Sequence, residues 1–252
     1  MDLGIKGKVA IIGGSSKGLG KACALALAAE GVNVVLCARN SDTLINTKKE
    51  VEALGVEVLA IEADMSVADD NIRIVENTIA KFGGIDILVN NSGGPKPGTF
   101  RDVTLSDMDE AYNSVLKYNV RMINLCLPYM EQSGWGRIVN ITSVSVKEPI
   151  EDIVLSNIFR SAVVSYAKTI SREIIKKGVT INNVCPGYFN TDRVKQLLKA
   201  NPNADQTSSF PHKRYMEPYE LGDLVAYLCS NQAKSINGTT IQIDGGMIKG
   251  IL

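Results

Sequence analysis

The sequence predicts an α/β protein, a doubly wound parallel sheet with helices on both faces. Three observations support this prediction. Short apolar runs alternate with helical segments, glycines end most of those segments, and no linker, repeat or low-complexity stretch divides the 252 residues. Strands that alternate with helices form parallel sheets, and right-handed crossovers then give a Rossmann-like arrangement. We therefore expect a single domain over residues 1–252.

The first half of the chain is expected to hold four strands and three helices. Each strand is a short apolar run, and each helix has apolar residues at helical spacing. The expected strands are residues 8–13, 32–38, 56–63 and 85–90, and the helices are 18–30, 43–54 and 67–82. Gly31, Gly55 and Gly83-Gly84 follow these helices, as is typical of helix C-termini.

The second half repeats the alternation with longer helices. Residues 105–133 form one long or kinked helix in which Pro128 marks a bend or a late turn. Helices 153–177 and 218–229 and strands 136–143, 180–185 and 239–244 complete the pattern. Residues 200–217 are polar and turn-rich, so we expect an irregular stretch there, within a substrate loop near residues 188–217.

Composition excludes several classes of protein. Lys+Arg and Asp+Glu both number 27, so the net charge is zero, and aromatic residues make up only 6%. Neither feature favours a surface for nucleic acid or anionic membranes. No apolar run approaches 18 residues, and residues 1–6 lack a signal-peptide pattern, so we expect a cytoplasmic protein.

Cysteine and histidine usage restricts the chemistry further. The five cysteines are widely spaced without a C-x-x-C motif, which predicts free, mostly buried thiols in a reducing compartment. His212 is the single histidine. A Ser-His-Asp triad or a histidine-built metal site is therefore improbable, and we expect no metal.

The most specific motif is a glycine-rich turn between the first strand and the first helix. It reads Gly13-Gly14-Ser15-Ser16-Lys17-Gly18-Leu19-Gly20. Glycines let the backbone approach a pyrophosphate, and the helix N-terminus supplies N–H groups and a positive dipole end. The turn predicts a dinucleotide site that includes Gly14, Ser16, Lys17, Gly18, Leu19 and Gly20.

The spacing G-x-x-x-G-x-G of Gly14, Gly18 and Gly20 resembles the short-chain dehydrogenase/reductase family, most nearly its 3-oxoacyl-ACP-reductase-like members. Further motifs match in order: Asp64, Asn90-Asn91-Ser92-Gly93, Tyr118-Asn119-Val120, Ile141-Thr142-Ser143, Pro186-Gly187 with Thr191, Asn237-Gly238 and Asp244-Gly245-Gly246. The resemblance implies that a nicotinamide cofactor contacts Asp64, Met65, Asn91, Gly93, Pro186, Gly187 and Thr191. It also implies a catalytic role for Ser143 and a structural and proton-relay role for Asn119.

The end of the second expected strand bears on cofactor choice. An acidic residue there would hold the ribose 2′-hydroxyl of NAD, but this chain has Ala38 followed by Arg39. A guanidinium can bind a 2′-phosphate, and Lys17 adds a second cation, so NADP(H) is favoured over NAD(H). The alternative is that Arg39 stacks on adenine or faces water.

One family feature is missing from the sequence. The family's tyrosine follows the serine by 13 residues and its lysine comes four later, which corresponds here to Ser156 and Arg160. Ser156 is a poor proton donor, whereas Arg160 could bind ribose hydroxyls or stabilise an oxyanion. Lys147, Glu148 and Tyr188 lie on loops expected near the pocket. Lys147 and Tyr188 are candidates to replace the acid, although a wall or surface role is the simpler interpretation. Tyr166 and Lys168 are two residues apart, face different sides of a helix and are rejected as the pair.

The sequence is compatible with three functions. The first is an NADP(H)-dependent oxidoreductase with altered proton transfer, acting on a carbonyl, an enone or an imine. The second is a catalytically silent NADP(H)-binding sensor or partner subunit, and the third is a lyase. We expect a small-molecule substrate and a homotetramer or homodimer built partly through the helices at 105–133 and 153–177. The substrate pocket is expected to be shaped by residues 94–98, 147–155 and 200–217.

Overall fold

The computed structural model describes residues 2–200, 205 and 207–251, in which seven parallel strands form one sheet in the order β3-β2-β1-β4-β5-β6-β7. The strands are β1 Val9–Gly13, β2 Asn33–Ala38, β3 Val58–Glu62, β4 Ile87–Asn90, β5 Gly136–Ile141, β6 Val179–Pro186 and β7 Thr240–Ile243. The helices are α1 Gly18–Ala29, α2 Ser41–Glu52, α3 Ala68–Phe82, α4 Leu105–Ala111, α5 Tyr118–Ser133, α6 Val154–Ile174, α7 Asp192–Ala200 and α8 Pro218–Leu228. The predicted doubly wound fold is confirmed.

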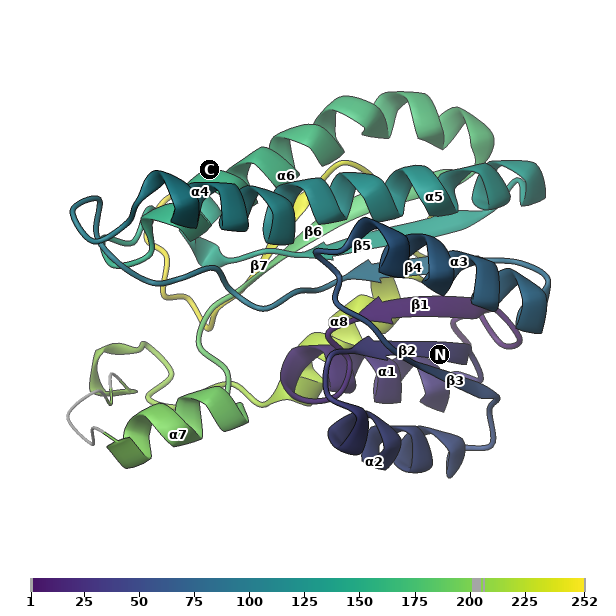
Figure 1. Cartoon of the computed structure of the whole chain (residues 1–252), viewed down its shortest axis with the longest axis horizontal. Coiled ribbons are helices and arrows are strands. Elements are labelled where there is room, and N and C mark those ends of the chain that lie inside the picture. The colour runs from purple at the N-terminus through teal and green to yellow at the C-terminus, as the bar shows by residue number, and fades with distance from the viewer. Residues whose placement is uncertain (1, 201–204, 206, 252) are drawn as a thin grey trace.

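Helices cover both faces of the sheet. In Figure 1, α1, α2 and α8 lie on one side, and α3, α5 and α6 lie on the other. The first strand shows why its sequence is uniformly apolar: Ala10 and Ile12 pack in the core beneath α1 and α8, whereas Val9 and Ile11 face α3 and α5. A central parallel strand is buried on both sides, so alternation of polar and apolar residues is absent.

The order of the strands creates a crevice at one point of the sheet. β1 pairs with β2 on one side and with β4 on the other, so the chain winds outward in opposite directions from β1. The connections that leave the carboxyl ends of β1 and β4 therefore diverge. Open α/β sheets bind their ligands at such a switch point.

A row of buried amides joins the carboxyl-terminal halves of three strands. Asn90, Asn140 and Asn183 are aligned in neighbouring strands, and their side chains are linked by two hydrogen bonds of 3.0 Å. Asn183 also donates to the hydroxyl of Thr240 on β7 at 3.3 Å. Buried amides are stable only when hydrogen-bonded, so this row fixes the relative height of the strand ends that carry the site.

The expected helix over residues 105–133 contains an irregularity that the sequence did not reveal. Tyr112–Lys117 form a π-helix, η1, between α4 and α5, and α5 then continues through Pro128 to Ser133. The side chains of Asn113 and Ser114 donate to carbonyls four residues earlier, at 2.8 Å each. Such bonds compete with the regular backbone pattern. π-Helical turns often lie at functional sites.

The substrate loop expected near residues 188–217 contains a helix that was not predicted, α7, which ends at Ala200, where the expected irregular stretch begins. Within that stretch, Thr207–Ser209 form a short 3-10 helix. Residues 201–204 and 206 of the predicted loop lie outside the described residues. Val194 and Leu198 stand four residues apart in α7, a helical spacing that the sequence analysis overlooked.

The thiols behave as the sequence predicts. All five cysteines are free and buried. Burial raises the pKa of Cys37 and Cys229 to about 12, so both are neutral near pH 7. In the described part of the chain, no helix is long and apolar enough to cross a bilayer.

Two glycines allow a stability test of close backbone packing. Gly178 (φ +79°) and Gly83 (φ +77°) both follow helices, but a Cβ at Gly178 would overlap the Gly134 carbonyl oxygen, whereas nothing lies within 4 Å at Gly83. We expect Gly83→Ala to lower the free energy of unfolding by roughly 1–2 kcal/mol through backbone strain alone. Gly178→Ala should cost about 1–3 kcal/mol more because of the overlap. Urea unfolding of both variants measures the difference, and equal losses would contradict the packing.

Candidate active site

The glycine-rich turn is built so that side chains are excluded from it. Gly14 and Gly18 have φ of +56° and +57°, values that favour glycine. A Cβ at Gly14 would lie 2.8 Å from Asn91 Nδ2, and one at Gly20 would overlap the Gly14 carbonyl oxygen. Asn91 Nδ2 donates to the Gly13 carbonyl at 3.0 Å, which ties the turn to the end of β4.

The helix that follows the turn presents its N-terminus to the same region. Lys17 occupies the N-cap position, and its side chain does not cap the helix. The first N–H groups of α1 therefore remain available to an anion, and the helix dipole favours negative charge there. Thr47 from α2 donates to the Ser16 carbonyl at 2.9 Å and holds the turn from outside.

A cavity of about 610 Å³ lies beside this turn at the switch point of the sheet. Eleven of the fifteen residues predicted to bind the cofactor line it: Gly14, Ser16, Lys17, Gly18, Leu19, Arg39, Asp64, Met65, Asn91, Gly93 and Thr191. Gly20 is instead packed behind the turn. A dinucleotide fits the observed combination of a glycine-lined wall and an uncapped helix end.

Several residues that line this cavity were not among the predicted site residues: Asn40, Thr43, Ala63, Ser66, Ser114 and Asp192. Ala38, Ser92 and Gly94, which the sequence had pointed to for cofactor choice, for a family motif and for the substrate pocket, line it too. Asn40 was detectable, because Asn-Ser-Asp-Thr is a helix-start signal, and Asn40 Oδ1 indeed accepts from the Thr43 N–H at 2.9 Å. Ser114 reaches the cavity from the π-helix, for which the sequence carries no clear signal.

Arg39 is one of the residues that line the cavity. Its side chain is 78% exposed, and its Nη1 atom lies 4.0 Å from Asp64 Oδ2. At that separation and exposure the ion pair is weak, so the guanidinium can turn toward a phosphate at small cost. Asp64 is held separately, because its Oδ1 atom accepts from the N–H and hydroxyl of Ser66 at 2.9 and 2.7 Å.

Thr191 lines the cavity, whereas Pro186 and Gly187 are not among the residues that line it. Thr191 Cγ2 lies 3.6 Å from the position of a Cβ at Gly18, so this residue sits over the glycine-rich turn. Pro186 ends β6, and the Gly187 N–H donates to the Ile243 carbonyl at 3.0 Å. A Cβ at Gly187 would lie 3.0 Å from Asp244 Cα, which explains the glycine.

Arg160 is anchored at the carboxyl end of β5, two residues before Ser143. Arg160 is only 9% exposed, and its Nη1 atom donates to the Ile141 carbonyl at 2.9 Å. Ser143 follows two residues later and accepts from the Ser145 N–H at 3.1 Å. Ser156 lies one turn before Arg160 on α6 and is 7% exposed. Three of the four predicted catalytic residues therefore belong to α6 and the end of β5.

Asn119, the fourth predicted catalytic residue, begins α5 directly after the π-helix. Its Nδ2 atom donates to the Val115 carbonyl at 2.6 Å. Its Oδ1 atom is buried and has no hydrogen-bond partner among the described residues. A buried acceptor of this kind normally binds a donor, which a water or a ligand can supply.

Two cations oppose the rise in the pKa of the Cys185 thiol near the ends of β5 and β6. The Thr142 hydroxyl lies 3.2 Å from Cys185 Sγ. Burial raises the pKa of this thiol, and the Thr142 hydrogen bond and the positive charges of Lys147 and Arg160 oppose that rise. Lys147 and Arg160 thus lie close enough to the ends of β5 and β6 to influence charge there.

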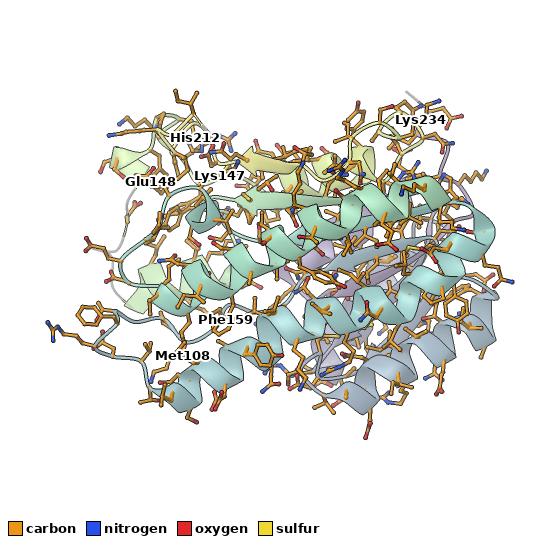
Figure 2. The ribbon with its side chains drawn as sticks, turned by 90° about the horizontal axis from the view of Figure 1, so that it is seen from above. Met108, Lys147, Glu148, Phe159, His212 and Lys234 are labelled. Atoms are coloured by element: carbon orange, nitrogen blue, oxygen red, sulfur yellow. The ribbon has the colours of Figure 1, made fainter. Side chains whose placement is uncertain are left out.

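The other candidate acids differ in their surroundings. Figure 2 labels Lys147 and Glu148 on the turn after β5; Lys147 is half-buried and Glu148 exposed. Tyr188 stacks on Phe210 with ring centroids 5.3 Å apart. Burial, with a smaller effect of Asp152, raises the Tyr188 pKa, which makes this tyrosine a weaker acid. Tyr166 packs against α5, and its hydroxyl lies 3.3 Å from Asn124 Oδ1, which supports its rejection.

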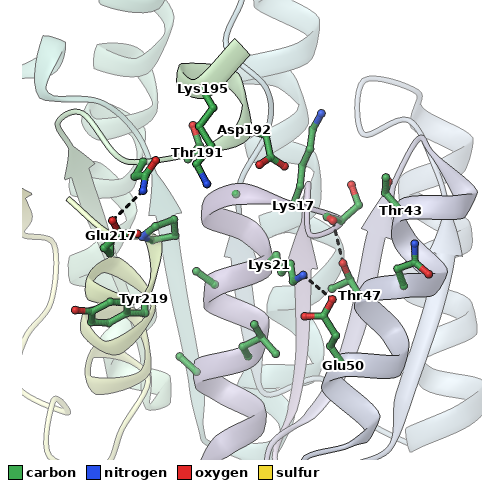
Figure 3. A pocket seen from close by; sticks show the side chains of 18 of the residues that line it. Lys17, Lys21, Thr43, Thr47, Glu50, Thr191, Asp192, Lys195, Glu217 and Tyr219 are labelled. Atoms are coloured by element: carbon green, nitrogen blue, oxygen red, sulfur yellow. Dashed lines mark hydrogen bonds and ion pairs between the residues drawn. The ribbon is translucent and has the colours of Figure 1, made fainter. Parts of the chain in front are cut away.

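A second cavity of about 630 Å³ lies on the far side of the glycine-rich turn. Figure 3 shows Lys17, Asp192 and Lys195 at its edge and the Lys21–Glu50 ion pair of 2.7 Å on its wall. It shares residues with the first cavity, namely Ser16, Lys17, Gly18, Thr43, Thr191 and Asp192. In the described part of the chain, no group of three or more His, Cys, Asp or Glu residues could hold a metal ion.

Comparison with known proteins identifies the family. The family described as Enoyl-(Acyl carrier protein) reductase matches residues 14–248. The chain belongs to the short-chain dehydrogenase/reductase family. The 3-oxoacyl-[acyl-carrier-protein] reductase FabG of Staphylococcus epidermidis is 32% identical over 243 residues, which cover 95% of this chain and 98% of the relative.

Two further relatives provide information on the cofactor. The NADPH-dependent reductase BacG of Bacillus subtilis is 30% identical over 97% of this chain and 99% of the relative. The L-sorbose reductase of Gluconobacter frateurii, solved with NADPH and L-sorbose, is 32% identical with a TM-score of 0.94 over the whole of both chains. These short-chain reductases use NADPH, in agreement with the preference predicted from Ala38 and Arg39.

Proposed function

We propose that this chain is an NADP(H)-dependent oxidoreductase that acts on a carbonyl, enone or imine group, with Ser156 and Arg160 at the positions of the family's tyrosine and lysine. The observation that carries the proposal is the buried Arg160 guanidinium on the Ile141 carbonyl, two residues before Ser143. It combines with a cavity that fits the cofactor and with relatives that are NADPH-dependent reductases.

Different residues of the cofactor cavity would bind different parts of the cofactor. The N-terminus of α1 and the glycine-rich turn would receive the pyrophosphate, while Arg39 and Lys17 would bind the 2′-phosphate. Asp64 and Met65 would line the adenine, with Asn91, Gly93, Pro186, Gly187 and Thr191 toward the nicotinamide. NADPH, when bound, supplies a hydride to the substrate carbon.

The hydride-transfer end relies on electrostatics rather than on a strong acid. Ser143 would hydrogen-bond the substrate oxygen or nitrogen, and Arg160 would stabilise the negative charge that develops on it. Ser156 can orient the substrate but is a poor proton donor. The proton would come from water held near Asn119 Oδ1, from Lys147 or from the substrate itself. Tyr188 is less suited because its pKa is raised.

The direct test is a titration of the purified protein with NADPH and NADH, followed by a panel of carbonyls, enones and imines. We expect tighter binding of NADPH and loss of nicotinamide absorbance with at least one substrate class. Binding without any turnover would instead support the alternative, a catalytically silent NADP(H)-binding sensor or partner subunit. That alternative is favoured by Ser156, a poor proton donor at the position of the acid, and by the burial of Tyr188, which raises the pKa of this tyrosine.

We also propose a single nucleotide-binding domain over residues 1–252, a homodimer or homotetramer, and a cytoplasmic location. Exposed apolar side chains on α4, η1 and α6 support the assembly, namely those of Leu105, Tyr112 and Ile158. Apolar residues clustered on helices often form interfaces between subunits. Light scattering of the purified protein distinguishes these assemblies from a monomer.

The proposed role of Arg39 predicts a change in cofactor preference. Arg39→Met removes the guanidinium that would bind the 2′-phosphate, so the Kd for NADPH should rise about tenfold or more, while the Kd for NADH stays unchanged. Arg101→Met is the matched control, because Arg101 is an exposed arginine that lies against Phe100, away from the cavity. Equal losses for the two cofactors would argue against a phosphate contact.

The proposed replacement of the acid predicts a gain of activity. Ser156→Tyr with Arg160→Lys restores the family's pair, and general acid catalysis contributes roughly 10²–10⁴-fold. We expect carbonyl reduction to rise by about 100-fold in the double variant and much less in either single variant. Steady-state rates at saturating NADPH measure this. Unchanged rates with intact NADPH binding would mean that the substrate pocket itself has diverged.

A further inference from the structure

The segment after β3 forms one wall of the cofactor cavity and has little regular structure of its own. Residues 63–66 line the cavity and precede α3. Asp64 is held by a 2.7 Å hydrogen bond from its N–H to Asp70 and by its own bonds to Ser66. A loop wall of this kind depends on neighbouring elements for its position.

A side chain from α5 reaches this segment. Arg121 on α5 donates through Nη1 to Asn71 Oδ1 at 2.9 Å and to the Ser66 carbonyl at 3.4 Å. Asn71 on α3 is fully buried, and its Nδ2 atom donates to the Met65 carbonyl at 3.1 Å. Arg121 therefore holds Ser66 directly and Met65 through Asn71. α3 and α5 lie side by side in Figure 1, which makes this reach possible.

The amide of Asn71 depends on Arg121. Its donor side is used by Met65, and its acceptor side is used by the guanidinium. Removal of the guanidinium would leave a buried acceptor without its partner, and the amide could then rotate to satisfy it. Such a rotation breaks the bond to Met65. The segment would lose two anchors at once.

Arg121 also belongs to the helix that carries the candidate catalytic asparagine. It follows Asn119 by two residues, and the π-helix immediately before α5 places Ser114 in the same cavity. The stretch from η1 into α5 thus contributes Ser114 to the cavity wall, carries the candidate catalytic Asn119 and, through Arg121, reaches the segment that would receive the adenine.

We propose that Arg121 is a positioning residue for the adenine half of the cofactor, acting through Asn71 and the carbonyls of Met65 and Ser66. Arg121 is not among the residues that line the cavity, and it acts by fixing the segment. The inference rests on the proposed NADP(H) site, because it requires residues 63–66 to be the adenine wall.

The test separates the two halves of the cofactor by calorimetry. Arg121→Met should raise the Kd for adenosine 2′,5′-bisphosphate by about tenfold or more and leave the Kd for reduced nicotinamide mononucleotide within about twofold. Arg121→Lys should recover part of the affinity, because an ammonium can still donate to Asn71 or Ser66. Arg101→Met is the control for loss of an arginine elsewhere.

The outcomes are distinguishable. Equal affinity of wild type and Arg121→Met for the bisphosphate overturns this inference alone, and so does an equal loss for both halves, which would indicate general loosening. Wild-type protein that binds no bisphosphate overturns the proposed function together with the inference. If Arg121→Met does not fold, Arg121→Lys carries the test, with a several-fold rise for the bisphosphate alone as the supporting result.

Discussion

The contact between the glycine-rich turn and Asn91 is the constraint on which the candidate site depends. The turn can approach the end of β4 only because Gly14 and Gly20 lack side chains, and the Asn91 amide then bonds to the Gly13 carbonyl. This contact directs the N-terminus of α1 into the crevice between β1 and β4. The parallel sheet supplies the crevice, and the turn makes it a site for an anion.

The predicted site residues fall into two groups in the structure. At the cofactor end, the turn, Asp64, Asn91 and Thr191 occupy the expected places around one cavity. At the hydride-transfer end, Ser156 and Arg160 are buried on α6, and the guanidinium is anchored on the end of β5. A fixed cation can stabilise developing negative charge without transferring a proton. Under the proposed function, the chemistry would therefore depend on how the site positions charge and admits water.

The sequence was sufficient where backbone conformation or local pattern determines the outcome. The sheet, the glycine-rich turn and the place of Arg39 follow from such local signals. The reach of Arg121 to Asn71 did not follow, because it depends on a contact between α3 and α5, which are distant in sequence. The π-helix before Asn119 has no clear signal in the sequence, and α7 was overlooked although Val194 and Leu198 have helical spacing. Ser114 lies on that π-helix and lines the cavity. A prediction that assumes a regular helix therefore does not place Ser114 at the cavity.

A crystal structure of the complex with NADP⁺ tests the central claim most directly. We expect the 2′-phosphate to lie between Arg39 and Lys17 and the pyrophosphate to lie at the N-terminus of α1. The nicotinamide ring should lie beside Ser143, and the Arg160 guanidinium should be within hydrogen-bonding distance of the ribose or of the substrate oxygen. A cofactor bound with its nicotinamide ring away from Ser143 and Arg160, or bound only in the second cavity on the far side of the turn, would contradict it.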